Sequence, residues 1–278
     1  MMRFLILSMV FGFTVAEFHP HFYNFLAKNY GKPVADQLSR RDIGRKGSFG
    51  GGNPNSKVFP IVLVHGLGGS AGQRKKDLYK KYKSYGQPAG TVYATTFANG
   101  ELLYGVQHAM LCEYIKLVRS LMVAVHDYTG QRLNVVGVSM GSPISRKAIL
   151  GGRCVDTNED LGPPLTNLVR RYVSVAGANR GALMCGNPLP FPNGICSPIN
   201  GLNCNSLFIK DINNQTGYEG DRTFNIYSLT DEIVGYMNNC GERASYIAGA
   251  VDIEQNHKTH RGLITTSTEE QWKALNSQ

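Results

Sequence analysis

The stretch NVVGVSMGSPISRKAI, residues 134–149, passes from a β-branched apolar segment directly into a segment with helical character. A single serine, Ser139, stands at the junction, flanked at a distance of two by Gly137 and Gly141. A sharp turn from strand to helix crowds the backbone, so glycine is needed where a side chain would clash. The helix that follows presents free N–H groups and the positive end of its dipole at the turn. The stretch therefore predicts a strand-turn-helix unit that projects the Ser139 hydroxyl clear of the backbone.

Strands and helices alternate outward from this unit. The strands are predicted at residues 58–64, 91–97, 133–138, 171–177 and 223–229. Helices are predicted from about Gln73, at residues 103–128, up to about Leu150, and from about Ser267. Strands that are apolar throughout and alternate with helices favour a parallel sheet covered on both faces. We therefore expect a single α/β domain over residues 58–278, with a mostly parallel central sheet.

The amino end of the chain has the pattern of an export signal. Residues 1–16, MMRFLILSMVFGFTVA, combine one early positive charge, an apolar run and small residues ahead of Glu17. This pattern predicts a secretory signal peptide cleaved near Ala16, and the run is short for a membrane-spanning anchor helix, which is the alternative. Residues 17–57 then form an N-terminal leader and a Gly-rich linker, GRKGSFGGGNPNS. We expect a secreted, extracellular protein.

The cysteines agree with export. An even number of cysteines in an oxidising compartment predicts disulfides, here three out of about fifteen possible connectivities. A zinc site is the alternative, but no pair has the close C-x-x-C spacing. Asn214-Gln215-Thr216 is a glycosylation sequon and predicts a surface loop. The six are Cys112, Cys154, Cys185, Cys196, Cys204 and Cys240.

The net charge is +9, and the densest basic run is RKKDLYKKYK, at residues 74–83. Leu78 and Tyr82 share one helical face of this run, which predicts an amphipathic helix with a solvated basic face. Transient contact with anionic lipid surfaces is the alternative. A short amphipathic run on an exported chain does not favour binding to nucleic acid, so we expect no nucleic-acid partner.

A serine hydroxyl is a poor nucleophile and needs a base and an anion-stabilising pocket beside it. The segment IVLVHGLGGS, residues 61–70, ends a strand with a run of small residues, and such a loop lets a backbone N–H approach a reacting carbonyl. We predict that the N–H groups of Leu67 and Met140 form an oxyanion hole. The alternatives are a plain Gly-rich turn at this loop and a turn serine without chemistry at Ser139.

In enzymes that carry a nucleophilic serine at such a turn, the nucleophile comes first in the chain, then the acid and then the histidine, and this order limits the candidates for the acid and the base. Only His257 and His260 follow far enough along the chain, and the loop at His260 leads into the last helix and folds back over the sheet edge. Asp231 follows a predicted strand, where a carboxylate would orient the imidazole. Glu232 is its alternative, and a helix-capping role is the structural alternative for Asp231.

Several segments together resemble the class 2 lipases, small secreted α/β-hydrolases of the nematode type, with more distant similarity to minimal bacterial lipases. They extend over residues 47–263 and read GSFGGGN, PIVLVHGLGG, VVGVSMGSPISRKAILGG, CVDTNEDLGPPLTNLV, VAGANRGAL, IYSLTDEIVGYMNNCG and HRGL. The resemblance implies an α/β-hydrolase fold, hydrolysis of the carboxylic esters of lipids, and no cofactor or metal. It implies Ser139 as nucleophile, Asp231 as acid and His260 as base, with N–H donors at Leu67 and Met140.

The bacterial relatives carry His-x-Gly-Leu, which favours His260 over His257, although Arg261 departs from the nematode-type form. The resemblance also implies disulfide-bonded cysteines, with Cys112 paired to Cys154. We expect a monomer whose partner is a lipid or ester substrate. An inactive lipid-binding protein, a serine acyltransferase and a serine peptidase on the same scaffold are the alternatives.

The substrate is left open by the sequence. The loop at residues 182–196 holds Leu183, Met184, Leu189 and Phe191 between two cysteines. It is either an acyl pocket or short flap, or a disulfide-tied loop that covers the sheet edge. Triacylglycerols, phospholipids and short soluble esters all fit this pattern.

Overall fold

The structure, a computed structural model, describes residues 17–186, 188 and 190–277. The predicted signal peptide, residues 1–16, lies outside the described residues. The strands are β1 (Ile61–Val64), β2 (Val92–Tyr93), β3 (Leu133–Val138), β4 (Val169–Val175), β5 (Arg222–Tyr227) and β6 (Val251–Glu254). The helices are α1 (Pro20–Tyr30), α2 (Lys32–Ser39), α3 (Ala71–Arg74), α4 (Lys80–Ser84), α5 (Leu102–Gln107), α6 (Cys112–Thr129), α7 (Gly141–Leu150), α8 (Leu207–Asn213), α9 (His260–Thr266) and α10 (Thr268–Asn276). A π-helical turn, Lys75–Tyr79, joins α3 to α4.

In the described part of the chain, six strands form one sheet in the order β2-β1-β3-β4-β5-β6, and all neighbouring strands are parallel. The chain moves outward from β1 to β2 and then returns to place β3 on the other side of β1. Parallel α/β sheets bind ligands beyond the carboxyl ends of the strands at such a reversal. The predicted parallel sheet is confirmed, and its topology directs attention to the loops after β1 and β3.

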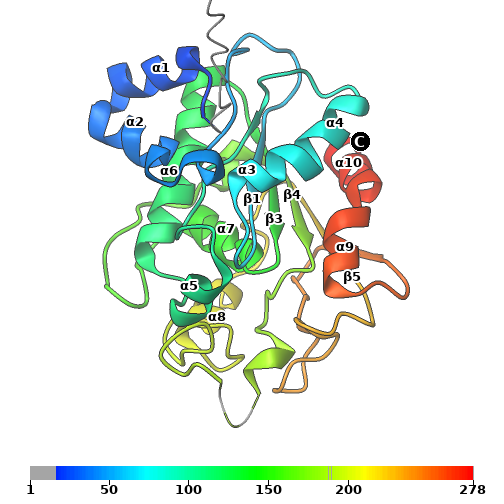
Figure 1. Ribbon diagram of the computed structural model, residues 1–278. Helices are drawn as coiled ribbons and strands as arrows, with labels where there is room; N and C mark the ends of the chain where they lie inside the picture. Colours follow the sequence, from blue (N-terminus) through cyan, green and yellow to red (C-terminus); the bar gives the residue numbers. More distant parts are fainter. Residues whose placement is uncertain (1–16, 187, 189, 278) are drawn as a thin grey trace, which may run out of the picture.

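Helices cover both faces of the sheet (Figure 1). Val62 and Val64 of β1 belong to the apolar cluster that includes α1, α2, α6 and α7. Ile61 and Leu63 belong to the cluster on the other face, with residues from α3, α4, α9 and α10. Because successive side chains of a strand point to opposite faces, burial on both faces explains why the strands are apolar throughout.

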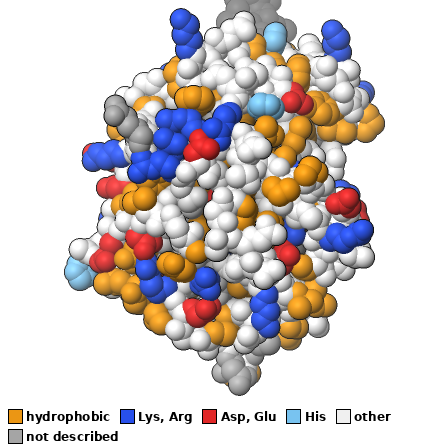
Figure 2. Space-filling model, turned by 180° about the vertical axis from the view of Figure 1, so that it is seen from behind, with side chains coloured by type: hydrophobic (Ala, Val, Ile, Leu, Met, Phe, Trp, Pro, Cys, Tyr) orange, Lys and Arg blue, Asp and Glu red, His pale blue; other side chains and the backbone are white. Residues whose placement is uncertain are grey.

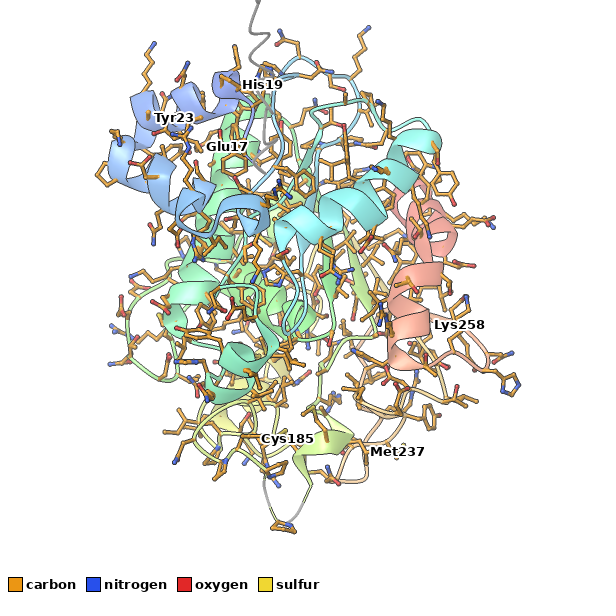
Figure 3. The ribbon with its side chains drawn as sticks, viewed as in Figure 1. Glu17, His19, Tyr23, Cys185, Met237 and Lys258 are labelled. Carbon is orange, nitrogen blue, oxygen red and sulfur yellow. A yellow bond between two sulfur atoms is a disulfide. The ribbon has the colours of Figure 1, made fainter. Side chains whose placement is uncertain are left out.

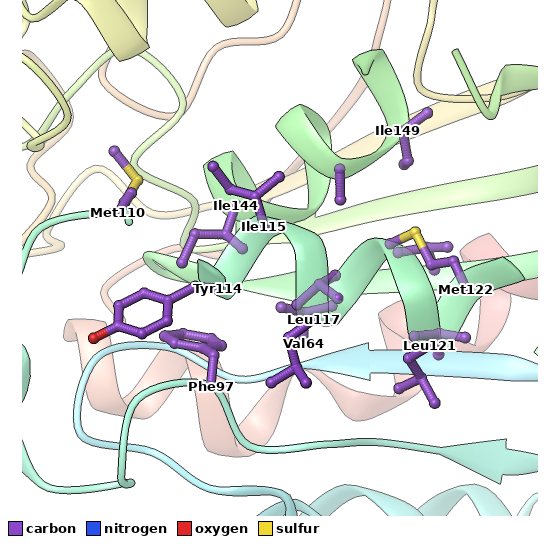
Figure 4. Close-up of a cluster of buried hydrophobic side chains, with 14 of the residues drawn as sticks. Val64, Phe97, Met110, Tyr114, Ile115, Leu117, Leu121, Met122, Ile144 and Ile149 are labelled. Carbon is purple, nitrogen blue, oxygen red and sulfur yellow. The ribbon is translucent and has the colours of Figure 1, made fainter. Parts of the chain in front are cut away.

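Helix α6 supplies much of the larger cluster. Its buried residues include Ile115, Val118, Met122 and Val125, which recur at the spacing of one helical face. Figure 4 shows side chains of α6 packed beside those of β1 and α7. This packing fixes α7, and with it the turn at Ser139, against the sheet.

The predicted single helix at residues 103–128 is wrong, because the structure divides it in two. Helix α5 ends at Gln107, and α6 begins at Cys112. Between them the N–H of Met110 donates to the carbonyl of Asn200 at 2.9 Å. This tertiary hydrogen bond takes the segment out of the helical pattern, which a local sequence pattern does not reveal.

The strand predicted at residues 91–97 is shorter than expected. Of residues 91–97, only Val92 and Tyr93, which form β2, pair with β1. Beyond it, Ala94 forms an antiparallel bridge with Phe49, and the hydroxyl of Thr96 donates to the carbonyl of Gly47 at 2.7 Å. The end of this segment therefore bonds to the Gly-rich segment instead of the sheet.

Residues 17–57 pack onto the same sheet. Phe22 and Leu26 of α1 are fully buried in the larger apolar cluster. Nδ1 of His21 lies 2.7 Å from the hydroxyl of Tyr128 on α6, and the N–H of Gly52 donates to the same hydroxyl at 3.2 Å. The amino-terminal segment thus contributes side chains to the core.

All six cysteines lie in the described part of the chain, and they form three disulfides: Cys112–Cys154, Cys185–Cys196 and Cys204–Cys240. The expected number and the expected first pair are confirmed. Figure 3 shows Cys185 at the end of the molecule that also holds Met237, whereas Glu17, His19 and Tyr23 lie at the other end. Within the described residues, no helix combines the length and the apolar character needed to cross a bilayer.

The basic segment at residues 74–83 is helical, and Leu78 and Tyr82 on its inner face are buried as predicted. The solvated basic face is confirmed for Lys80 and Lys83, which are exposed. It is wrong for Arg74, of which only 7% is exposed. Arg74 lies four residues before Leu78, so it shares the inner face of the helix.

Figure 2 shows that basic side chains gather on the rear face of the molecule. Arg132, Arg171 and Arg222 form one basic group at the amino ends of β3, β4 and β5. Arg132 binds both carboxylate oxygens of Asp221, at 2.6 and 2.7 Å. Arg171 lies close enough to Arg132 and Arg222 for their positive charges to repel its own. This group lies at the edge of the sheet opposite the loops that follow the strands, so it is separate from the site described next.

Candidate active site

Ser139 stands in the tight turn between β3 and α7. Its φ of +52° is a conformation that residues other than glycine rarely adopt. A Cβ at Gly141 would lie 2.2 Å from the carbonyl oxygen of His65, and one at Gly137 would lie 2.6 Å from Oγ of Ser145. The two glycines are therefore needed for close packing, as the sequence indicates. Strain of this kind persists only where the surrounding structure enforces it.

Ser139, His260 and Asp231 form one chain of hydrogen bonds. Nε2 of His260 lies 3.0 Å from Oγ of Ser139, and Nδ1 of His260 lies 2.8 Å from Oδ2 of Asp231. The three side chains come from the turn after β3, the loop after β5 and the first residue of α9. The structure thus brings together three residues that are 29 and 121 positions apart in the sequence.

Asp231 is held as an ionised hydrogen-bond acceptor. Its Oδ1 accepts the N–H groups of Ile233 and Val234 at 3.0 and 2.9 Å, and 6% of the residue is exposed. Burial raises the pKa of Asp231, but the hydrogen bond from His260 and the two N–H donors outweigh burial, so the pKa is lowered. A carboxylate in this state stabilises a positively charged imidazole ring.

The alternatives for the base and the acid lie elsewhere. His257 is exposed and takes no part in this chain of hydrogen bonds. Glu232 accepts the backbone N–H of His260 at 2.9 Å, and its carboxylate is not the one that meets the ring. Thr259 caps α9 by accepting the N–H of Gly262. Glu232 and Thr259 therefore fix the start of α9, which carries His260.

Leu67 and Met140 both line the cleft in front of Ser139. Among the described residues, neither backbone N–H has a hydrogen-bond acceptor. Met140 directly precedes the first residue of α7, so its N–H belongs to the positive end of that helix. The two N–H groups are thus available to an oxygen that enters the cleft.

The cleft has a volume of about 760 Å³ and two different walls. The apolar wall comes from α5 and from the loops after β4 and β5, and its residues are Leu102, Met184, Ile195, Leu202, Ile233 and Val234. The polar wall comes from the helix at residues 71–84 and from α9, and its residues are Gln73, Arg74, Asp77, Lys81, Arg261 and Thr265. Ser139 and His260 line the same cleft, so a molecule with an apolar tail and a polar end fits this space.

The loop at residues 182–196 contributes to the apolar wall through Met184 and Ile195. Leu183 and Phe191 are exposed instead, at 45% and 52%. Leu189 lies outside the described residues. The disulfide Cys185–Cys196 closes the loop beside the cleft.

A buried polar network beneath the turn has no strong signal in the sequence. Oγ of Ser142 lies within hydrogen-bond distance of Tyr172, Ser174 and Asn179, at 3.0, 2.9 and 2.8 Å. Asn179 also donates to the carbonyl of Ser245 at 2.9 Å. These bonds join the start of α7 to β4 and to two loops, so they hold the turn at Ser139 in place.

His65, in the loop after β1, has a structural role. Its ring stacks on Phe97 at 3.9 Å, and Nε2 accepts the N–H of Phe97 at 3.2 Å. Nδ1 lies 2.8 Å from the carbonyl oxygen of Gly66, so the proton of the neutral ring is on Nδ1. Burial lowers the pKa of His65 to about 3.

This geometry predicts an acid-sensitive fold. The unfolded chain binds a proton at the ordinary pKa of 6.5 and the folded chain only near 3, so the contribution of His65 to stability falls as the pH drops through this range. From about pH 7.5 to about pH 5, the contribution of His65 to the free energy of unfolding should fall by roughly 2 kcal/mol. Urea unfolding of the wild type and of His65→Phe, which does not titrate, measures this. A difference in unfolding free energy between the two proteins that stays constant with pH would contradict it.

The parallel sheet, the strained turn after β3 and the loops that meet beyond the strands define an α/β-hydrolase fold. The sequence matches the family model described as Lipase (class 2) over residues 58–273, and the chain belongs to the class 2 lipase family. The nematode-type subgroup stays a prediction. A comparison with curated proteins finds no match.

Solved structures share the fold at low sequence identity. Lipase B of Aspergillus fumigatus aligns with a TM-score of 0.57 and 15% identity, covering 77% of this chain and 51% of that protein. This chain therefore spans about half the length of the Aspergillus lipase. The mature form of lipase BlEst2 of Bacillus licheniformis aligns with a TM-score of 0.55 and 16% identity, covering 81% and 95%. These likenesses establish the fold.

Proposed function

We propose that this protein is a secreted serine lipase or esterase that hydrolyses the carboxylic ester bonds of lipids of the triacylglycerol type. The observation that carries the proposal is the chain of hydrogen bonds from Ser139 through His260 to Asp231, at the junction of an apolar and a polar wall. A serine, a base and an orienting acid in this order are the parts that nucleophilic acyl transfer requires.

In the proposed first step, Nε2 of His260 takes the proton of Ser139 while Oγ attacks the ester carbonyl carbon. The carbonyl oxygen becomes an oxyanion that accepts the N–H groups of Leu67 and Met140. His260 then gives its proton to the alkoxide oxygen as the ester C–O bond breaks, and the alcohol leaves. The carboxylate of Asp231 stabilises the imidazolium throughout.

The second step removes the acyl group from Ser139. His260 takes a proton from water, the resulting hydroxide attacks the acyl-serine carbonyl, and Ser139 leaves with the proton that His260 returns. The sum is one ester and one water converted into one carboxylic acid and one alcohol. No cofactor takes part in this sequence, and the acyl chain would lie along the apolar wall.

Export is part of the proposal. The predicted signal peptide at residues 1–16 and the three disulfides support a secreted, extracellular enzyme. We further propose that it acts as a monomer. Asn214 is exposed in the turn after α8, so the sequon there is accessible to glycosylation. A mobility shift on enzymatic removal of N-linked sugars would detect the glycan.

The experiment that tests the function is hydrolysis of the nitrophenyl esters of butanoate, octanoate and hexadecanoate by the secreted protein. The same protein treated with a serine-directed phosphonate is the control. Turnover that rises with chain length and is abolished by the phosphonate supports a lipase. Turnover restricted to butanoate makes the protein a carboxylesterase.

Three results would replace the proposal with an alternative. A folded protein inert on every ester would be a lipid-binding protein. Preferential transfer of the acyl group to an added alcohol would make it an acyltransferase, and cleavage of peptides without cleavage of lipid esters would make it a peptidase.

A further inference from the structure

Arg74 is a buried cation on the helix at residues 71–84. It is 7% exposed, and no side chain or carbonyl among the described residues forms an ion pair or hydrogen bond with its guanidinium group. Its Nε is completely covered. The residue lines the cleft that also holds Ser139 and His260. A guanidinium group carries five N–H donors and stays charged in proteins, so Arg74 brings donors without acceptors to the lining of the cleft.

The charges around Arg74 favour an anion. The polar wall holds three cationic side chains, Arg74, Lys81 and Arg261, against one carboxylate, Asp77. Asp77 is exposed and makes no ion pair with Arg74. Lys81 donates to the carbonyl of Thr265 at 2.8 Å, which ties the helix at residues 71–84 to α9 across this wall. The wall is therefore both held in place and positively charged.

Burial of Arg74 needs a compensating interaction. Burial disfavours the charged form and lowers the pKa of Arg74, and the nearby charge of Asp77 opposes this effect only in part. The π-helical turn begins at Lys75, directly after this residue, and such turns occur frequently at functional sites. An arginine held in this state is suited to bind an anionic oxygen group that enters the cleft.

We infer that Arg74 forms an anion subsite that holds the phosphodiester group of a glycerophospholipid while one of its acyl esters lies at Ser139. In such a lipid the phosphate and the acyl esters are attached to one glycerol, so a single cleft with an apolar and a cationic wall accommodates both. The inference rests on the proposed ester hydrolysis. Water cleaves the acyl C–O bond to give a fatty acid and a lysophospholipid, and the phosphodiester stays intact.

The test compares two soluble substrates below their aggregation concentrations: dihexanoylglycerophosphoglycerol, which is anionic, and dihexanoylglycerol, which is neutral. We expect the ratio of kcat/KM for the anionic over the neutral ester to fall about tenfold or more in Arg74→Gln, mainly through KM, because a charge-assisted bidentate pair is lost. Arg74→Lys should retain part of the ratio. Lys83→Gln removes one exposed charge from the same helix outside the cleft and should leave the ratio unchanged.

A second measurement needs no variant. Hexyl phosphate should inhibit hydrolysis of nitrophenyl butanoate by the wild type competitively, with an inhibition constant about tenfold or more below that of hexanol. Equal constants would overturn the inference, as would a ratio that is the same in Arg74→Gln and the wild type. Inhibition by inorganic phosphate as strong as that by hexyl phosphate would also overturn it, because the subsite would then belong to free phosphate. A wild type that cleaves neither ester contradicts the proposed function itself, whereas cleavage of the neutral ester without anion dependence contradicts only the inference.

Discussion

The Ser139→Ala variant is expected to lose about 10⁴- to 10⁶-fold in kcat for ester hydrolysis, because no other group in the cleft replaces the nucleophile. Its fold should be unchanged. Alanine has the same difficulty as serine at a φ of +52°, so the strain of the turn stays the same. The substitution removes the hydroxyl group, and among the described residues the only hydrogen bond lost with it is the one to His260. Initial rates on nitrophenyl butanoate, with urea unfolding of both proteins, measure the two effects separately.

Residues of such a unit do not contribute independently. A Ser139→Ala/His260→Ala double variant should therefore be about as slow as either single variant. His257→Ala is the matched control, because His257 is the exposed histidine nearby and should leave the rate at the wild-type level. A Ser139→Ala variant that retained more than about a tenth of the activity would show that another group attacks the ester.

The second large effect is expected at a buried ion pair behind the turn. Arg146 of α7 is 1% exposed, and so is Glu219 in the loop before β5. Nε of Arg146 donates to Oε1 of Glu219 at 2.9 Å, and Nη2 lies 2.9 Å from the same oxygen. Glu219→Leu leaves the guanidinium charge buried without its counter-charge, which should lower the free energy of unfolding by about 3–5 kcal/mol.

The double variant Arg146→Met/Glu219→Leu distinguishes the charge from the packing. It removes both charges at similar volume, so it should recover at least half of the stability that Glu219→Leu loses. Recovery is incomplete because the carbonyl of Ile212, which accepts Arg146 Nη2 at 2.9 Å, is left without this donor. Urea unfolding of the three proteins gives the comparison. Equal losses in the single and double variants would mean that shape, and not charge, governs this position.

The sequence predicts the central part of the sheet well and its edges poorly. Strands β3, β4 and β5 lie within a few residues of their predicted positions, because burial on both faces makes them continuously apolar. Strand β6 reads VDIE and was not predicted. It lies at the edge of the sheet and is mostly exposed, and its apolar and polar residues alternate over only four positions, which is too short a pattern to stand out in the sequence.

The candidate site shows the same division. The meeting of Ser139, Asp231 and His260 follows from chain order and from the shared carboxyl edge of the strands, although their catalytic role stays a prediction. Arg74 was open to prediction, since it shares a helical face with Leu78. The network around Ser142 was not, because Ser, Asn and Tyr are equally common at surfaces and only the tertiary fold brings them together.

Helix α1 is synthesised well before α6, the helix against which it packs. His21 precedes its partner Tyr128 by 107 positions. At about 5–20 residues per second, α1 leaves the ribosome roughly 5–20 s before α6 is available to cover it. Over that interval Phe22 and Leu26 lack the side chains of α6 that share their apolar cluster in the folded protein.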